Sequence, residues 1–131
     1  KLFKHYKGAL QGKKIAVWGL AFKPETDDMR EAPSLVLIDS LLKAGCEVCA
    51  YDPVAMDECK RRIGDVISYG KNMYDTVIDA DAIFHVTEWK EFRMPSWGVI
   101  KKAMKKNPVL IDGRNVFGTS ELEGIDYLKI G

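Results

Sequence analysis

The sequence predicts an α/β fold, namely a Rossmann-like, doubly wound and mostly parallel sheet of about six strands with helices on both faces. Short apolar runs typical of buried strands alternate with amphipathic helical patterns, and short links separate them. A crossover between parallel strands needs a covering segment, usually a helix, so this alternation indicates a parallel sheet. The 131 residues, 47% of them hydrophobic, suffice for one domain with one core.

The first half of the chain supplies the clearest elements. Residues 14–19 form a near-continuous apolar run ending in glycine, which is typical of a strand buried on both faces. A helix is expected from Pro33, a residue favoured at the first helical position, up to a capping residue at Gly45. The other expected strands are 47–51, 66–68, 82–87, 109–112 and 127–130, and the other expected helices are 55–63, 73–78 and 97–105.

Composition and charge argue against several classes of partner. With 20 basic and 19 acidic residues the formal net charge is +1, so no electrostatic footprint favours nucleic acid or an anionic membrane. The apolar runs fall far short of the roughly 20 residues that cross a bilayer, and no secretory signal opens the chain, so a cytoplasmic location is expected. Residues 1–11 are expected to end an interdomain linker and residues 12–131 to form the domain.

The three cysteines are expected to be reduced thiols, because their number is odd and a chain with this core needs no disulfides. Cys46 and Cys49 have a C-x-x-C spacing, but they lie in a segment expected to be a strand, where positions i and i+3 point to opposite faces. A second cysteine or histidine pair is also missing, so no metal site is expected.

The long loop after the first strand holds the first candidate binding residues. Doubly wound sheets bind ligands outside the carboxyl ends of their strands, yet this loop lacks the G-x-G-x-x-G fingerprint that cradles the pyrophosphate of NAD. It offers instead Phe22, a ring that stacks on a base or covers a sugar, and Lys23, a positive charge for phosphate. Arg30 adds a planar fork of donors. The alternative is a solvated loop with ordinary ion pairs.

Arg114 is a second candidate, because it follows the strand expected at 109–112 and so belongs to the same edge of the sheet. Lys23 and Arg114 would then converge on one anionic ligand; alternatively, Asp112 and Arg114 pair locally. Asp52 ends the second strand, where an acidic residue bonds a ribose in dinucleotide-binding domains. Without the glycine fingerprint, a turn cap is favoured there.

The residues around the fourth strand offer no convincing catalytic chemistry. His85 is expected in a buried strand and His5 in the basic opening segment, neither with a serine or cysteine partner. Trp89 and Phe92 are expected to pack against the sheet edge rather than bind a cofactor. No catalytic residue is predicted.

Short motifs follow one another along the expected sheet edge: GLAFKP at 19–24, TDD at 26–28, REAPS at 30–34, YDP at 51–53, TEW at 87–89, EF at 91–92 and DGRN at 112–115. In composition and order they closely resemble motifs of the C-terminal domain of the UDP-glucose/GDP-mannose dehydrogenase family. The resemblance covers roughly residues 12–118. One such motif would be weak evidence for the resemblance, whereas several motifs in the same order across one fold are strong evidence.

The resemblance implies the UDP-sugar-binding domain of an enzyme that oxidises the C6 hydroxyl of a nucleotide sugar, UDP-glucose above all, to a carboxylate in two NAD-dependent steps. By that likeness Phe22, Lys23 and Arg114 contact the nucleotide sugar, and Arg30 reaches across the domain cleft to NAD. The catalytic cysteine and the NAD fingerprint are expected in N-terminal and central helical domains that this chain lacks. The chain alone is therefore expected to be inactive, and the full-length enzyme to be a homodimer.

Three other classes of protein are weighed against this one. A free-standing ligand-binding or regulatory module with a doubly wound sheet is the main alternative. A receiver-type signalling domain would need an acidic pair directly after the first strand, where Gly19 and Leu20 stand. A complete small dehydrogenase is opposed by the missing glycine fingerprint and the missing nucleophile.

Overall fold

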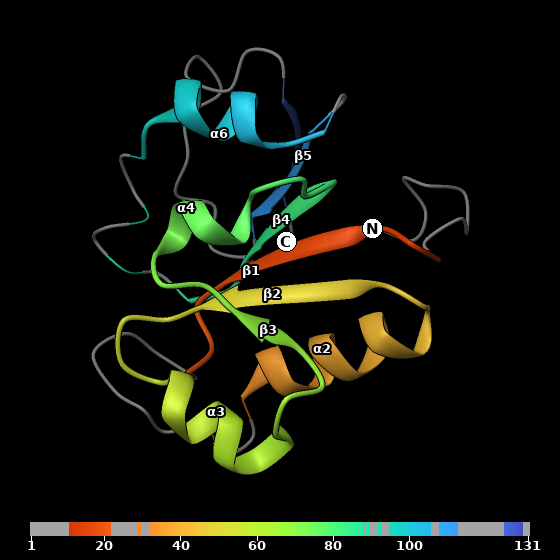
Figure 1. The fold of residues 1–131 in the computed structure, drawn as a ribbon, viewed down its shortest axis with the longest axis vertical. Helices are drawn as coiled ribbons and strands as arrows, with labels where there is room; N and C mark the ends of the chain where they lie inside the picture. The colour runs from red at the N-terminus through yellow and green to blue at the C-terminus, as the bar shows by residue number, and fades with distance from the viewer. Residues whose placement is uncertain are drawn as a thin grey trace.

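The computed structural model describes residues 11–21, 29, 32–87, 89, 92, 95–105, 108–112 and 125–129 (Figure 1). The strands within these ranges are β1 (Lys14–Trp18), β2 (Glu47–Tyr51), β3 (Ser68–Tyr69), β4 (Ala82–His85), β5 (Val109–Asp112) and β6 (Asp126–Lys129). The helices are α2 (Pro33–Lys43), α3 (Met56–Ile63), α4 (Met73–Thr76) and α6 (Trp97–Ala103). Among the described residues, none of the helices has the length and apolar character of a membrane-spanning segment.

All six strands join in one parallel sheet with the order β3-β2-β1-β4-β5-β6. The chain builds outward from β1 to β3, crosses to the other side of β1, and builds outward again from β4 to β6, which is the strand order of a Rossmann fold. The predicted fold class is therefore confirmed. The direction of winding reverses between β1 and β4, and such sheets bind ligands beside the carboxyl ends of the strands at this reversal.

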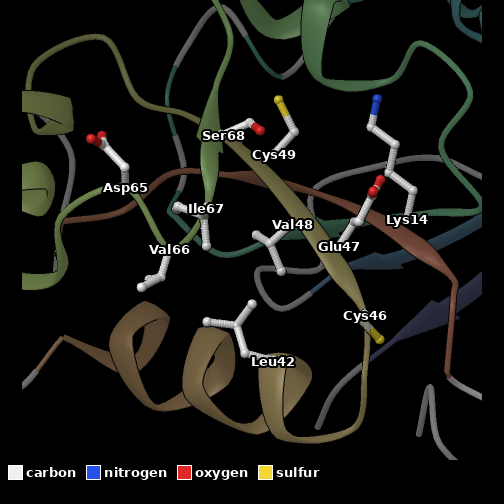
Figure 2. A pocket seen from close by; sticks show the side chains of 10 residues that line it. All are labelled: Lys14, Leu42, Cys46, Glu47, Val48, Cys49, Asp65, Val66, Ile67 and Ser68. Carbon is white, nitrogen blue, oxygen red and sulfur yellow. The ribbon is translucent and has the colours of Figure 1, made fainter.

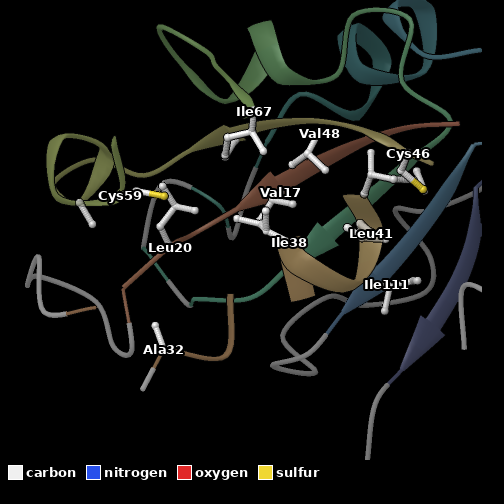
Figure 3. Packing of buried hydrophobic residues seen from close by; sticks show 14 of the residues in the cluster. Val17, Leu20, Ala32, Ile38, Leu41, Cys46, Val48, Cys59, Ile67 and Ile111 are labelled. Carbon is white, nitrogen blue, oxygen red and sulfur yellow. The ribbon is translucent and has the colours of Figure 1, made fainter. Parts of the chain in front are cut away.

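Two apolar clusters cover the two faces of the sheet, and β1 contributes to both. Its side chains Ile15 and Val17 belong to one cluster, while Ala16 and Trp18 belong to the other, all four fully buried. Figure 3 shows the first cluster, in which α2 and α3 pack on the sheet. Residues of α4 and α6 belong to the second, and Figure 1 shows the two pairs of helices on opposite sides of the sheet.

The ends of several elements differ from the predicted ones, without any change in their order. β4, α4 and α6 each end two residues earlier than predicted. For α4 the cause is local: the hydroxyl of Thr76 donates back to the Met73 carbonyl at 2.6 Å, and Asp79 adopts a positive φ of 57°. β3 pairs with β2 through only two residues, and Val66, predicted as its first residue, is 59% exposed and lies outside the strand.

Candidate functional site

The carboxyl ends of five neighbouring strands stand in register. Tyr51 pairs with Trp18, Trp18 with His85, His85 with Asp112, and Asp112 with Lys129. Because neighbouring strands lie about 4.8 Å apart, the loops that follow β1, β4 and β5 all start within about 10 Å of one another. The loops predicted to bind a ligand therefore leave the sheet at one edge, beside the reversal of winding.

The four residues predicted to bind ligand, Phe22, Lys23, Arg30 and Arg114, lie outside the described residues. Their contacts therefore stay a prediction. The described chain stops directly before Phe22 and two residues before Arg114, in both cases at the carboxyl edge of the sheet. The described residues form the carboxyl edge of the sheet as far as Ala21 and Asp112, where the two loops begin.

Gly19 forms the exit from β1 and has no room for a side chain. Its φ is +94°, in the region that favours glycine, and a Cβ added there would lie 2.4 Å from the Cβ of Thr87. Its amide donates to the carbonyl of Tyr51 at 2.9 Å. In a dinucleotide-binding turn the space beside such a glycine admits the pyrophosphate; here Thr87 fills it.

Asp52 caps the turn after β2 and is fully buried. One carboxylate oxygen accepts hydrogen bonds from the amides of Leu20 and Ala21 at 2.8 and 3.3 Å. The other accepts from the amides of Val54 and Ala55, both at 2.8 Å. The predicted turn cap is confirmed, and it also ties the exit of β1 to the turn after β2. Four amides occupy the roughly four acceptor positions of a carboxylate, so none is left for a ribose hydroxyl.

Two buried hydroxyls bind the carbonyls of the same exit. Thr87 Oγ1 donates to the Ala21 carbonyl at 2.6 Å, and Ser34 Oγ donates to the Leu20 carbonyl at 2.5 Å. On the return side of the loop, Met29 is fully buried and its carbonyl accepts from the amide three residues later at 3.1 Å. The loop after β1 thus starts and ends at fixed points. Neither hydroxyl could be predicted, because a single serine or threonine carries no pattern of its own.

Phe92 closes the second face of the sheet at this edge. Its fully buried ring stacks on Trp18 at a centroid distance of 5.4 Å and meets the rings of Tyr51 and His85 edge-on at 6.1 and 5.8 Å. Trp89 packs against the same cluster. The prediction that both aromatic residues pack the sheet edge is confirmed. Because these rings fill the space, a ligand at this edge must lie beyond the strand ends rather than on that face.

A buried hydrogen-bonded set of three side chains, His85, Asp112 and Tyr127, links β4, β5 and β6. Nδ1 of His85 lies 3.0 Å from Oδ1 of Asp112, and the hydroxyl of Tyr127 donates to Oδ2 of the same carboxylate at 2.5 Å. His85 and Asp112 are fully buried, and Tyr127 is half-buried. An ionised Asp112 would only accept hydrogen bonds, and His85 would then carry its proton on Nδ1. Sequence spacing gave no sign of this hydrogen-bonded set, because its three residues come from three strands.

The cysteines contribute no reactive thiol to this edge. Cys46, Cys49 and Cys59 are buried and form no disulfide, and burial raises the pKa of each thiol above its ordinary value. Cys46 belongs to the cluster on the first face, and Figure 2 shows the Cys49 sulfur pointing the other way, as predicted. Among the described residues no group of side chains could hold a metal ion.

An open hollow of about 300 Å³ lies at the opposite end of the sheet (Figure 2). Its walls include Lys14 and Glu47, which begin β1 and β2, and residues 65–67, which precede β3. These are the amino ends of the strands, whereas ligands of doubly wound sheets bind at the carboxyl ends. The hollow is therefore separate from the candidate site.

Comparison with known sequences identifies relatives for most of the chain. Residues 16–119 match the UDP-glucose/GDP-mannose dehydrogenase family, UDP binding domain. The chain is 41% identical over 131 residues to a UDP-glucose 6-dehydrogenase of Pseudomonas aeruginosa, covering 96% of this chain and 29% of that protein. It is 42% identical over 118 residues to UDP-glucose 6-dehydrogenase AglM of Haloferax volcanii, covering 90% and 26%. The chain thus spans less than a third of these relatives.

Solved structures repeat the same arrangement. The NDP-N-acetyl-D-galactosaminuronic acid dehydrogenase of Methanosarcina mazei Go1 superposes with a TM-score of 0.80 at 32% identity, covering 98% of this chain and 26% of that one. A UDP-glucose dehydrogenase of Pyrobaculum islandicum superposes with a TM-score of 0.79 at 27% identity, covering 99% and 27%. In each of these dehydrogenases the superposed part is about a quarter of the chain.

Proposed function

Because the chain belongs to the UDP-glucose/GDP-mannose dehydrogenase family, through its UDP binding domain, we propose that it binds the nucleotide-sugar substrate of an NAD-dependent 6-dehydrogenase. The substrate we favour is UDP-glucose, oxidised at its C6 hydroxyl to the carboxylate of UDP-glucuronate, since the relatives above carry that name. The observation that carries the proposal is the register of strand ends at the reversal of winding, where both candidate loops leave the sheet.

In this proposal Phe22, Lys23 and Arg114 supply the binding chemistry. A diphosphate presents several anionic oxygens, and burying them without cations would cost a large desolvation free energy. Lys23 offers a compact charge, Arg114 a planar fork that matches phosphate oxygens, and Phe22 a ring for the base or the sugar. The placement is supported by the short separation of the β1 and β5 ends, about 10 Å across two strand spacings.

The proposal assigns NAD to another part of a longer protein, because the first turn of this fold does not fit the cofactor. Thr87 fills the space beside Gly19, and backbone amides occupy the carboxylate of Asp52. An N-terminal NAD-binding domain would hold the dinucleotide, and Arg30 would reach it across the cleft between the domains.

The catalytic cysteine is likewise assigned outside this chain. A thiolate is the reactive form of cysteine, and the described cysteines are buried with pKa values raised by that burial, which disfavours thiolate. A full-length enzyme with NAD-binding and central helical domains would supply the nucleophile, and this chain alone would be inactive. We propose that the full-length enzyme is a cytoplasmic homodimer.

Calorimetric titration of the chain with UDP, UDP-glucose, GDP and NAD tests the ligand assignment. UDP and UDP-glucose are expected to bind, and NAD is not. Binding should weaken between low and moderate salt, because screening reduces the attraction between side-chain cations and phosphate. Binding of NAD without UDP would contradict the proposal, and binding of neither would favour a ligand-binding module of another specificity.

Substitutions test the residues. Lys23→Ala and Arg114→Ala are each expected to weaken UDP binding by about 1.5 to 3 kcal/mol, the range for a lost hydrogen bond to a charged group. Lys43→Ala is the matched control, since this α2 lysine is 77% exposed and pairs with an exposed aspartate. Arg30→Ala should leave UDP binding unchanged and raise the NAD concentration that the full-length enzyme requires; an effect on sugar binding alone would contradict its assignment.

A further inference from the structure

The packing of the sheet does not require the hydrogen-bonded set of His85, Asp112 and Tyr127. The preceding positions on the same face of β4 and β5 are apolar: Ile83 and Leu110, two residues before His85 and Asp112, are fully buried. Burying a carboxylate and an imidazole costs free energy that apolar side chains of similar volume would not. Packing alone therefore does not explain a polar set at this place.

Asp112 is held from both sides at the last residue of β5. Register between β4 and β5 places His85 directly beside Asp112. Register between β5 and β6 pairs Tyr127 with Leu110, so the tyrosine reaches Asp112 along the diagonal that long side chains can span. Because the two partners bind different oxygens of the carboxylate, they oppose rotation of this side chain and pin the end of β5 to both neighbouring strands.

The surroundings strengthen these hydrogen bonds. The ring of Phe92 meets the imidazole of His85 edge-on at 5.8 Å and is itself fully buried. Hydrogen bonds to a carboxylate are charge-assisted, and a surrounding of low polarity makes them stronger than they would be in water. The end of β5 is therefore stiffer than strand pairing alone would make it.

We propose that His85, Asp112 and Tyr127 are positioning residues for the nucleotide site. Arg114 follows Asp112 by two residues in the sequence. In this proposal the hydrogen bonds of Asp112 fix the point from which the loop that carries Arg114 starts. In this proposal none of the three residues touches the ligand. The inference rests on the proposed function, because it assumes that Arg114 binds phosphate.

Tyr127→Phe tests the proposal, because it removes one hydroxyl and keeps the ring. Its matched control is Tyr74→Phe: Tyr74 is also half-buried, packs against the same cluster, and accepts from the amide of Ser96 at 2.9 Å. UDP affinity is measured by calorimetry on the full 131-residue chain, at a temperature where circular dichroism shows every variant folded. Tyr127→Phe should raise the Kd about three- to tenfold, and Tyr74→Phe should change it less than about twofold.

A second pair of variants separates positioning from packing. Asp112→Asn keeps the shape of the side chain and one accepting oxygen, so it should retain more UDP affinity than Asp112→Ala. This graded rescue is expected of a residue that acts through its hydrogen bonds.

The measured UDP affinities distinguish failure of the positioning role from failure of the proposed function. Unchanged affinity in Tyr127→Phe, or an equal loss in both tyrosine variants, would overturn the positioning role. Equal affinity in the two Asp112 variants would do the same. Absence of UDP binding by the unsubstituted chain would instead refute the proposed function, and this inference with it, before any variant is compared.

Discussion

Replacing Asp52 by asparagine tests most directly how the carboxyl edge of the sheet is held together. The substitution keeps the shape of the side chain but exchanges one oxygen for an NH₂ group, which only donates. Whichever oxygen is lost, two amides lose their acceptor: on one side the buried amides of Leu20 and Ala21, and on the other the buried amide of Ala55 with that of Val54, whose residue is 49% exposed.

The expected cost follows from those two amides. A buried donor without an acceptor costs about 1 to 3 kcal/mol. The NH₂ group is expected to face Val54 and Ala55, where only the Ala55 amide is buried, so the free energy of unfolding should fall by at least about 1 to 3 kcal/mol. That is a substantial part of the roughly 5 to 15 kcal/mol typical of a folded domain. Urea unfolding followed by tryptophan fluorescence measures it. Asp39→Asn is the control, because that carboxylate is 63% exposed and its pair with Lys43 contributes about 1 kcal/mol at most.

The outcome that would refute this reasoning is an equal, small loss for Asp52→Asn and Asp39→Asn. It would mean that the four hydrogen bonds of Asp52 do not hold the exit of β1. A large loss that leaves UDP binding unchanged at low temperature would keep the stabilising role but separate it from the ligand site. A loss of both is what we expect, since the loop that carries Lys23 starts at this exit.

Other predictions concern backbone strain and pH. Gly19→Ala should lower the free energy of unfolding by at least about 1 to 3 kcal/mol, because its φ is positive and its Cβ would clash; Gly98→Ala, in α6 with open space around it, should raise it by about 0.5 kcal/mol. Glu58, hydrogen-bonded to Arg61 and Arg62, should show a pKa of about 2 in an NMR titration. Since that pKa is lower than 4.5, its stabilising contribution is complete above pH 4.5 and disappears as the pH falls through 2; a measured pKa near 4.5 would contradict these bonds.

Local patterns were sufficient to predict most of the fold. α2 begins at Pro33, and Gly45 follows its end with a φ of +88° and an amide that donates to the Leu42 carbonyl, as the proline and glycine positions indicate. Element ends were less predictable, because contacts outside the local pattern set them. The hydroxyl of Thr76, for example, binds its own helix and also accepts from Nε1 of Trp18 on β1.

The candidate site was predicted less completely, for a physical reason. A turn cap at Asp52 follows from its place after a strand, but two of its four amides come from more than thirty residues away and only the fold brings them there. The contact between His85 and Asp112 likewise spans 27 residues and two strands. Such long-range pairs leave no trace in spacing. The candidate binding residues Phe22 and Lys23 were predicted from a local motif, and their contacts stay a prediction.

The way this edge is built bears on how it can bind a nucleotide. A dinucleotide-binding turn holds phosphate with backbone amides and a helix N-terminus beside small glycines, and it bonds a ribose with an acidic residue. Here the space beside Gly19 is taken by Thr87, and the carboxylate of Asp52 binds amides of the chain itself. These groups stabilise the fold and are not available to a ligand. We therefore expect cationic side chains of the loops, Lys23 and Arg114 in our proposal, to hold a diphosphate at this edge. Because exposed charges are screened within about 10 Å at 0.1 M salt, UDP affinity should fall more steeply with salt than it does for a backbone cradle.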